Sequence, residues 1–336
     1  MRIRIGNQTA FSSSPMIPFE YAADCGFDAF EWLPDKKESG EGWSESEISP
    51  ETRKFIRDTA LTHDIRQSVH APWPSNPLEP TAGGLFAETV QFARDIAASL
   101  INIHFSSGNG IEAYAGAVIP FAKRLAEAGI MLSIENTPDS GPETFNELFL
   151  HFYEADLQAA ANIGMCLDIG HANLHSATRN DYLGYMDRLH PRVPIIHIHM
   201  HENYGDSDSH LTIFTGPSKN NSLGVQGVIE RLKKRNFSGA IILEEWPKPE
   251  SLLLDARNRL RDMIAENKEV PPGAAPEPVD LAAMIIEADS RLPNWKKKLE
   301  WIEKLLTQDL PAPEPADLAS IALYLRFIAR GEIGCR

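Results

Sequence analysis

Cysteine is scarce in this sequence. The 336 residues include three cysteines, Cys25, Cys166 and Cys335, and no two of them form a Cys-x-x-Cys pair. An odd number of scattered cysteines argues against a disulfide framework and against a metal site built from thiolates. Cys166 lies in an apolar run, where a cysteine packs as a small hydrophobic residue.

Long apolar runs are absent as well. No stretch approaches the ~20 apolar residues that a helix needs to cross a bilayer. The first residues, Met-Arg-Ile-Arg-Ile-Gly, are typical of a first β-strand and not of a signal peptide. We therefore expect a cytoplasmic protein without a membrane-spanning segment.

Positive charge is in short supply too. The chain has 32 Lys and Arg residues against 47 Asp and Glu residues, which gives a net charge of −15. Non-specific affinity for nucleic acid comes largely from Lys and Arg side chains that neutralise phosphates. The charge balance therefore argues against a broad nucleic-acid-binding surface.

Short apolar runs alternate with longer amphipathic runs from Met1 to about Glu266. The short runs predict eight strands, at Ile3 to Asn7, Ala29 to Leu33, Gln67 to His70, Leu100 to Phe105, Met131 to Glu135, Met165 to Ile169, Pro194 to His199 and Ala240 to Glu244. The longer runs predict helices, among them Pro50 to Thr62, Ala87 to Ser99, Ile111 to Ala128 and Thr144 to Ala161. This alternation predicts an α/β protein with a closed (β/α)₈ TIM barrel. A doubly wound open sheet is the alternative, but it usually has a Gly-rich turn after an early strand, and Gly6 to Phe11 lack one.

The composition changes after the barrel. Pro271 to Pro278 predict an extended linker, because proline blocks helix formation. Asp280 is suited to cap a following helix, and a second helix is expected around Trp295 to Thr307. We therefore expect a barrel over 1–266 and a Pro-rich linker with a small helical extension over 267–336. The extension is expected to pack on the barrel or on another subunit, and in the latter case the protein is a homo-oligomer.

Metal-binding residue types stand where the predicted strands end. In a TIM barrel the functional residues gather at the carboxyl ends of the strands. The residues found there, on the third to sixth and the eighth strands, are His70, His104, Glu135, Asp168 with nearby His171, and Glu244. Each one alone could cap backbone groups or pair with an Arg. Convergence from consecutive strands predicts a site for a divalent metal.

The seventh strand adds the densest group of imidazoles. His197, His199 and His201 alternate, so they share one face of the strand, and Asp208 and His210 follow after a turn. His197 lies deeper in the strand and is expected inside the barrel, beside a ligand. Asp208 is preferred to Asp206 as a ligand because of its spacing to His210.

Three of these motifs together carry a family resemblance. They are Ile134-Glu135-Asn136-Thr137-Pro138, Leu167-Asp168-Ile169-Gly170-His171 and His199-x-His201-Glu202-Asn203-x-Gly205-x-x-Asp208-x-His210. From Met1 to about Glu266 the chain resembles the xylose isomerase-like TIM barrels, a superfamily that includes sugar-phosphate isomerases, epimerases and endonuclease IV. Glu202 stands where Asp is commoner in that family.

The resemblance to the epimerases and isomerases implies one central divalent metal, zinc or manganese. Its ligands would be Glu135, Asp168, His199 and Glu244. The same two glutamates match the pair that moves protons at a carbon next to the substrate carbonyl. The implied function is a metal-dependent isomerase or epimerase of a sugar or sugar phosphate.

The resemblance also implies an alternative, because the endonuclease IV pattern is complete in this sequence. In that pattern the first zinc is bound by His70, His104 and Glu135, the second by the central ligands, and the third by His171, Asp208 and His210. Up to three clustered ions suit phosphoester hydrolysis. A non-catalytic metal- or sugar-binding barrel is the third possibility.

Three tryptophans follow closely on predicted strand ends. Trp32, Trp73 and Trp246 are candidates to wall a polar pocket against which a sugar ring stacks, with His201 as a further substrate contact. Packing at the barrel rim is the alternative for these tryptophans. The loop 215–218 departs from the Gly-rich segment common in the family at this point, which weakens the case for phosphate recognition.

Overall fold

The computed structural model describes residues 2–9, 14–34, 36–37, 39–72, 75–79, 82–106 and 108–266. Trp73 and the whole predicted C-terminal extension, 267–336, lie outside the described residues, so these expectations stay predictions.

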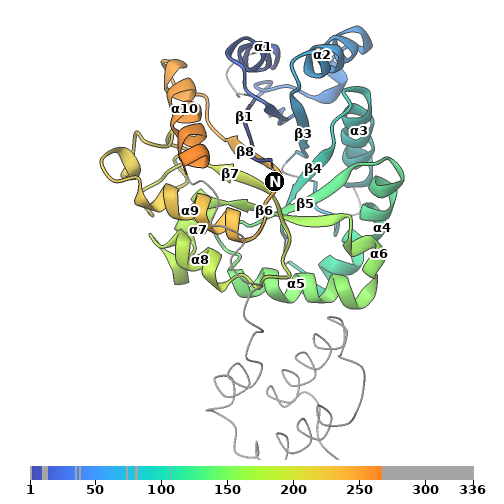
Figure 1. Ribbon diagram of the computed structural model, residues 1–336. Coiled ribbons are helices and arrows are strands. Elements are labelled where there is room, and N and C mark those ends of the chain that lie inside the picture. Colours follow the sequence, from blue (N-terminus) through green and yellow to red (C-terminus); the bar gives the residue numbers. More distant parts are fainter. Residues whose placement is uncertain are drawn as a thin grey trace, which may run out of the picture. The chain divides into compact units, whose positions relative to one another are not determined.

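Eight parallel strands close into a barrel, with each strand hydrogen-bonded to the next and β8 to β1. Figure 1 shows the strands as a central ring with the helices around it. The strands are β1 Arg4–Gln8, β2 Ala29–Trp32, β3 Arg66–His70, β4 Leu100–His104, β5 Met131–Glu135, β6 Ile163–Asp168, β7 Ile195–Met200 and β8 Ala240–Leu243. The predicted (β/α)₈ barrel is confirmed, and all eight strands form within two residues of their predicted limits.

The helices follow the amphipathic runs. They are α1 Met16–Cys25, α2 Pro50–Thr62, α3 Ala82–Asp95, α4 Ile111–Glu127, α5 Pro142–Ala155, α6 Leu157–Ala160, α7 Ile169–Leu174, α8 Tyr182–Arg188, α9 Leu223–Lys234 and α10 Ser251–Glu266. The helix predicted over 144–161 is interrupted at Asp156, which has extended backbone and accepts a hydrogen bond from the Ala159 N–H at 2.9 Å. This capping bond begins α6 as a new helix. The spacing of apolar residues, on which the prediction of one helix rested, does not indicate such a cap.

Trp32 was expected to wall a pocket, and the structure places it elsewhere. Its side chain is fully buried in an aromatic cluster with Phe19, Phe30, Trp43 and Phe92. Its indole N–H donates to Gln67 Oε1 at 3.0 Å. Because the last residue of β2 points between strands and helices, the ring packs in the outer core and does not reach the strand-end cavity.

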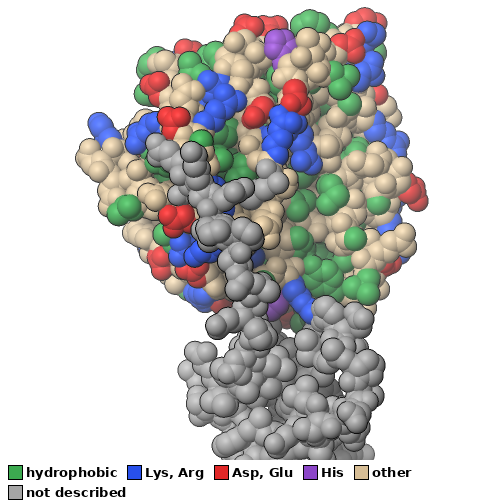
Figure 2. All heavy atoms as spheres, in the orientation of Figure 1, with side chains coloured by type: hydrophobic (Ala, Val, Ile, Leu, Met, Phe, Trp, Pro, Cys, Tyr) green, Lys and Arg blue, Asp and Glu red, His purple; other side chains and the backbone are tan. Residues whose placement is uncertain are grey.

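The surface carries mixed charge. Lys and Arg side chains lie among Asp and Glu side chains on the face shown in Figure 2. Arg2 and Arg4 both pair with Asp64, at 2.5 and 2.8 Å. Among the described helices, none combines the length and the apolar composition that a bilayer span requires.

Gly6 tests how closely β1 and β2 approach. A Cβ at Gly6 would lie 2.5 Å from the carbonyl oxygen of Ala29, its partner in the ladder. Gly6→Ala is therefore expected to lower the free energy of unfolding by about 1–3 kcal/mol, as overpacking does. Chemical denaturation measures the loss.

Gly116→Ala is the matched control, because Gly116 is exposed on α4 and an added Cβ meets no atom within 4 Å. That variant should be as stable as the parent or slightly more stable, since Ala favours helix. Equal stability of the two variants would contradict the close approach of β1 and β2.

Candidate metal centre and adjoining cavity

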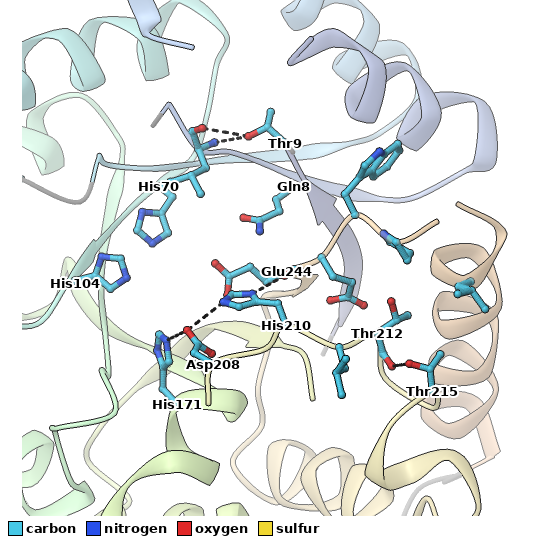
Figure 3. Close-up of a pocket in the computed structure, with 16 residues that line it drawn as sticks. Gln8, Thr9, His70, His104, His171, Asp208, His210, Thr212, Thr215 and Glu244 are labelled. Atoms are coloured by element: carbon cyan, nitrogen blue, oxygen red, sulfur yellow. Dashed lines mark hydrogen bonds and ion pairs between the residues drawn. The ribbon is translucent and has the colours of Figure 1, made fainter. Parts of the chain in front are cut away.

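A cavity of about 610 Å³ opens where the strands end. Figure 3 shows the side chains that point into it, among them Gln8 from β1, His70 from β3 and His104 from β4. The rest of the wall comes from residues that follow β1 and β2, from helix α7 after β6, from the loops that follow β7 and β8, and from α10. None of the described residues that line this cavity is a Lys or an Arg.

Four predicted ligands meet at the floor of the barrel mouth. Glu135, Asp168, His199 and Glu244 each offer one ligand atom, and these atoms all lie within 4.8 Å of one another. His199 Nδ1 lies 3.2 Å from Glu135 Oε2 and 3.4 Å from Glu244 Oε2. Three of the four side chains are fully buried, and Glu244 is 6% exposed.

The same group contains polar atoms without hydrogen bonds. Glu135 Oε1, His199 Nδ1 and Glu244 Oε2 are buried, and none of them has a hydrogen-bond partner. Burying such atoms unpaired is costly unless another group compensates them. Three carboxylates and one imidazole are a donor set that suits zinc or manganese. The residues therefore fit a divalent cation.

Glu135 and Glu244 differ in their electrostatic surroundings. Burial raises the pKa of Glu135, but the positive charges of His199 and His104 outweigh it, and the net pKa lies well below the usual range. Burial also raises the pKa of Glu244, opposed by His199 and reinforced by Glu135, and here the net shift is upward. Surroundings that shift the pKa values of two carboxyl groups in opposite directions are typical of an acid and base pair.

Glu31 is a buried partner that the sequence analysis missed. Its two carboxylate oxygens accept hydrogen bonds from His199 Nε2 at 2.6 Å and from His197 Nε2 at 2.7 Å. The bond to Glu31 orients the His199 ring, so Nδ1 is the ring atom that faces Glu135 and Glu244 and can bind a cation once it carries no proton. A lone carboxylate between Phe30 and Trp32 in a buried strand was the available signal, since such a charge needs a partner.

A second group adjoins the first through Glu135. His70, His104 and Glu135 also hold their ligand atoms within 4.8 Å of one another. His70 Nδ1 donates to the carbonyl oxygen of Ala71 at 2.8 Å, which leaves its Nε2 facing Glu135 Oε2 at 3.1 Å. His104 Nε2 lies 3.5 Å from Glu135 Oε1.

A third group forms around Asp208. Its Oδ2 lies 3.2 Å from His171 Nε2 and 3.1 Å from His210 Nε2. The Nδ1 atoms of the two imidazoles donate to the carbonyl oxygens of Asn136 and Glu244, each at 2.8 Å. His210 turns back to Asp208 with a φ of 43°, a left-handed value that is uncommon outside glycine.

In this third group, Asp208 and the two histidines shift one another's pKa values. Burial lowers the pKa of His210, but its hydrogen bond to Asp208 and the charge of Glu244 raise it to about 10. Partial burial raises the pKa of Asp208, but His171 and His210 hold it well below its usual range. Asp206 is exposed and accepts a hydrogen bond from the Ser207 N–H at 2.8 Å, so Asp208 is the residue that the structure brings to the site.

The structure places two of the predicted substrate contacts in different cavities. Trp246 lines the cavity, as expected. His201 does not: its Nε2 lies 3.3 Å from Asp168 Oδ2, its ring stacks on His210 at 3.9 Å, and it lines a separate cavity beside Asn203 and Tyr204. The His201 side chain instead joins the potential ligands, since its ligand atom and those of His210 and Glu244 all lie within 4.8 Å of one another.

The chain belongs to the xylose isomerase-like TIM barrel family, whose profile matches residues 19–263. A second profile, that of the phosphoglucan water dikinase linker domain, matches residues 277–336. The uncharacterized protein MJ1311 of Methanocaldococcus jannaschii is 27% identical over 154 residues, which are 42% of this chain and 47% of that protein. The match thus spans about half the length of this relative.

Two solved structures share the barrel. One is a D-tagatose 3-epimerase-like protein, with a TM-score of 0.60 and 21% identity, covering 78% of this chain and 98% of that chain. The other is D-psicose 3-epimerase with D-tagatose from Clostridium cellulolyticum H10, with a TM-score of 0.56 and 13% identity, covering 78% and 99%. At these identities the likeness shows a common fold.

Glu31 gives a test of the central group. Glu31→Gln keeps the shape but weakens the acceptor that orients His199, so we expect the dissociation constant for zinc or manganese to rise about 10- to 100-fold. Titration of metal-free protein with each ion measures it.

Glu45→Gln is the control, because Glu45 is a buried carboxyl outside all three ligand groups that accepts a hydrogen bond from Thr89 at 2.8 Å. Its affinity for metal should match the parent. Unchanged affinity in Glu31→Gln would show that Glu31 does not orient a ligand.

Proposed function

We propose that this protein is a metal-dependent isomerase or epimerase of a small sugar. The observation that carries the proposal is the convergence of two glutamates, Glu135 and Glu244, with Asp168 and His199. Glu244 lines the cavity, and the group contains buried atoms that have no hydrogen bond. The D-tagatose 3-epimerase-like neighbour with the same barrel supports this choice.

The proposed chemistry divides between the cation and the two glutamates. When bound by the four central ligands, a divalent cation polarises a carbonyl and makes the neighbouring C–H more acidic. One glutamate carboxylate takes the proton from that carbon, and the C–H electron pair moves toward the carbonyl. The other glutamate donates a proton to the opposite face, which inverts the carbon. In the epimerase role Glu135 and Glu244 are thus both ligands and the acid and base.

The wall of the cavity favours a small uncharged substrate. The described lining offers Thr9, Thr212 and Trp246 beside the histidines and carboxylates, and no Lys or Arg. A sugar ring can stack on an indole and hydrogen-bond to such groups. Glu202 accepts hydrogen bonds from the N–H groups of Gly216 and Ser218, both at 3.0 Å, so these loop donors are already engaged.

A multi-zinc phosphoesterase of the endonuclease IV type is the second candidate. The observation in its favour is that the ligand sets with His70 and His104, and with His171 and His210, are each assembled around a carboxylate. Clustered cations generate hydroxide and neutralise phosphate oxygens. The net charge of −15 and the lining without Lys or Arg weigh against a nucleic-acid substrate. A barrel that binds metal or sugar without turnover is the remaining alternative.

Glu244→Gln separates an enzyme from a binding protein. The amide cannot take up the proton, so turnover should fall about 10²- to 10⁴-fold while the sugar still binds weakly. Deuterium uptake from D₂O into D-tagatose, D-fructose and D-psicose, followed by NMR, measures proton transfer directly. Parent-level exchange in Glu244→Gln would exclude this mechanism.

Metal content separates the two enzyme candidates. We expect elemental analysis of protein purified without chelator to find close to one divalent ion per chain, unchanged by His70→Ala or His171→Ala. Two or three zinc ions in the parent, with fewer in these variants, would place phosphoester hydrolysis first.

A further inference from the structure

Apart from the metal-ligand candidate Glu244, two of the described residues that line the cavity have side-chain oxygen atoms without any hydrogen bond. They are Gln8, through Oε1, and Glu245, through both carboxylate oxygens. Both side chains line the cavity, and the residues are only 5% and 6% exposed. The backbone of Ile213 faces the Glu245 carboxyl group, but makes no hydrogen bond of ordinary geometry with it.

The two residues come from neighbouring strand ends. Gln8 is the last residue of β1, and Glu245 follows β8 by two residues. The two strands pair in parallel, with Asn7 opposite Leu243. Figure 3 shows the Gln8 amide projecting into the cavity on the side where Glu244 lies.

Neither residue belongs to the metal-ligand groups. In the described part of the chain, no set of His, Cys, Asp and Glu ligand atoms that lie within 4.8 Å of one another includes Glu245. Gln8 carries a neutral amide, which is not among these ligand types. His210, Glu244 and Glu202 are charged groups that act electrostatically on Glu245. No described Arg or Lys lines the cavity to pair with it. An unpaired buried polar group destabilises the fold, so stability does not explain why these two side chains occupy buried positions.

We propose that Gln8 and Glu245 form a hydroxyl-recognition pair, which binds hydroxyl groups of the substrate beside the central metal site and selects an unphosphorylated sugar over its phosphate ester. The inference rests on the proposed function and adds the residues that decide specificity. A hydroxyl group donates to a carboxylate or amide oxygen and completes its hydrogen bonding. A phosphate placed there would meet acidic side chains, without an Arg or Lys from the described wall to neutralise it.

Glu245→Met and Gln8→Met test the pair. Methionine has a similar length and removes the polar atoms. We expect each variant to raise the dissociation constants for D-fructose and D-tagatose at least tenfold, measured by calorimetry on metal-loaded full-length protein. Without sugar, the midpoint of thermal unfolding of Glu245→Met should rise, because the variant no longer buries an unpaired carboxyl group.

Glu127→Met on α4 is the control, since Glu127 is exposed and remote from the cavity lining. It should bind both sugars as the parent does. Fructose 6-phosphate is the third probe, and the parent should bind it more weakly than D-fructose.

The outcomes separate this inference from the proposed function. Parent protein that binds the free sugars through the pair but shows no deuterium exchange would overturn the proposed reaction and leave the recognition pair standing. Unchanged sugar binding in both Met variants, no binding of either free sugar by the parent, or tighter binding of fructose 6-phosphate would overturn the pair. A lower unfolding midpoint in Glu245→Met would show a structural role for the carboxyl group instead.

Discussion

The site depends on how each histidine is anchored. One ring nitrogen of His70, His171 and His210 donates to a backbone carbonyl oxygen, and one of His199 donates to Glu31. The second nitrogen of every ring is thereby turned toward a carboxylate of the ligand groups, at 3.1 to 3.2 Å. Two acceptors that face each other repel unless a proton or a cation lies between them. The orientation of the imidazoles is what makes this barrel mouth suitable for a divalent cation.

The barrel supports this arrangement from below. Asn102 in β4 donates to Glu135 Oε2 at 2.5 Å, and Ser133 in β5 donates to Asn102 Oδ1 at 2.7 Å. Such a chain of hydrogen bonds holds a buried carboxylate in one position, which a loop could not do. The cost of burying these polar groups is offset by the apolar packing between strands and helices. The apolar packing between strands and helices thus stabilises the fold, while the inside of the barrel holds the polar side chains of the candidate site.

The strands and the ligands could be predicted from the sequence because both follow simple periodicities. Apolar runs mark the strands, and closure of the barrel alone brings His70, Glu135 and Glu244 together. Glu31 was missed because it lies inside an apolar run and its partners, His197 and His199, are 166 and 168 positions away. Trp32 was misplaced because the face to which a strand's last residue points depends on register, which a single sequence does not show. The lack of hydrogen-bond partners for Gln8 and Glu245 could not be predicted, because a missing contact can be recognised only from atomic positions.

The most direct test of the central claim is a crystal structure of the protein grown with zinc or manganese, with anomalous diffraction collected at the absorption edge of that metal. The account predicts an anomalous peak among Glu135, Asp168, His199 and Glu244, within ligand distance of His199 Nδ1. If these four side chains paired only with one another and no peak lay among them, the site would be a network of protonated histidines and carboxylates, and the metal-dependent chemistry proposed for this barrel would be wrong.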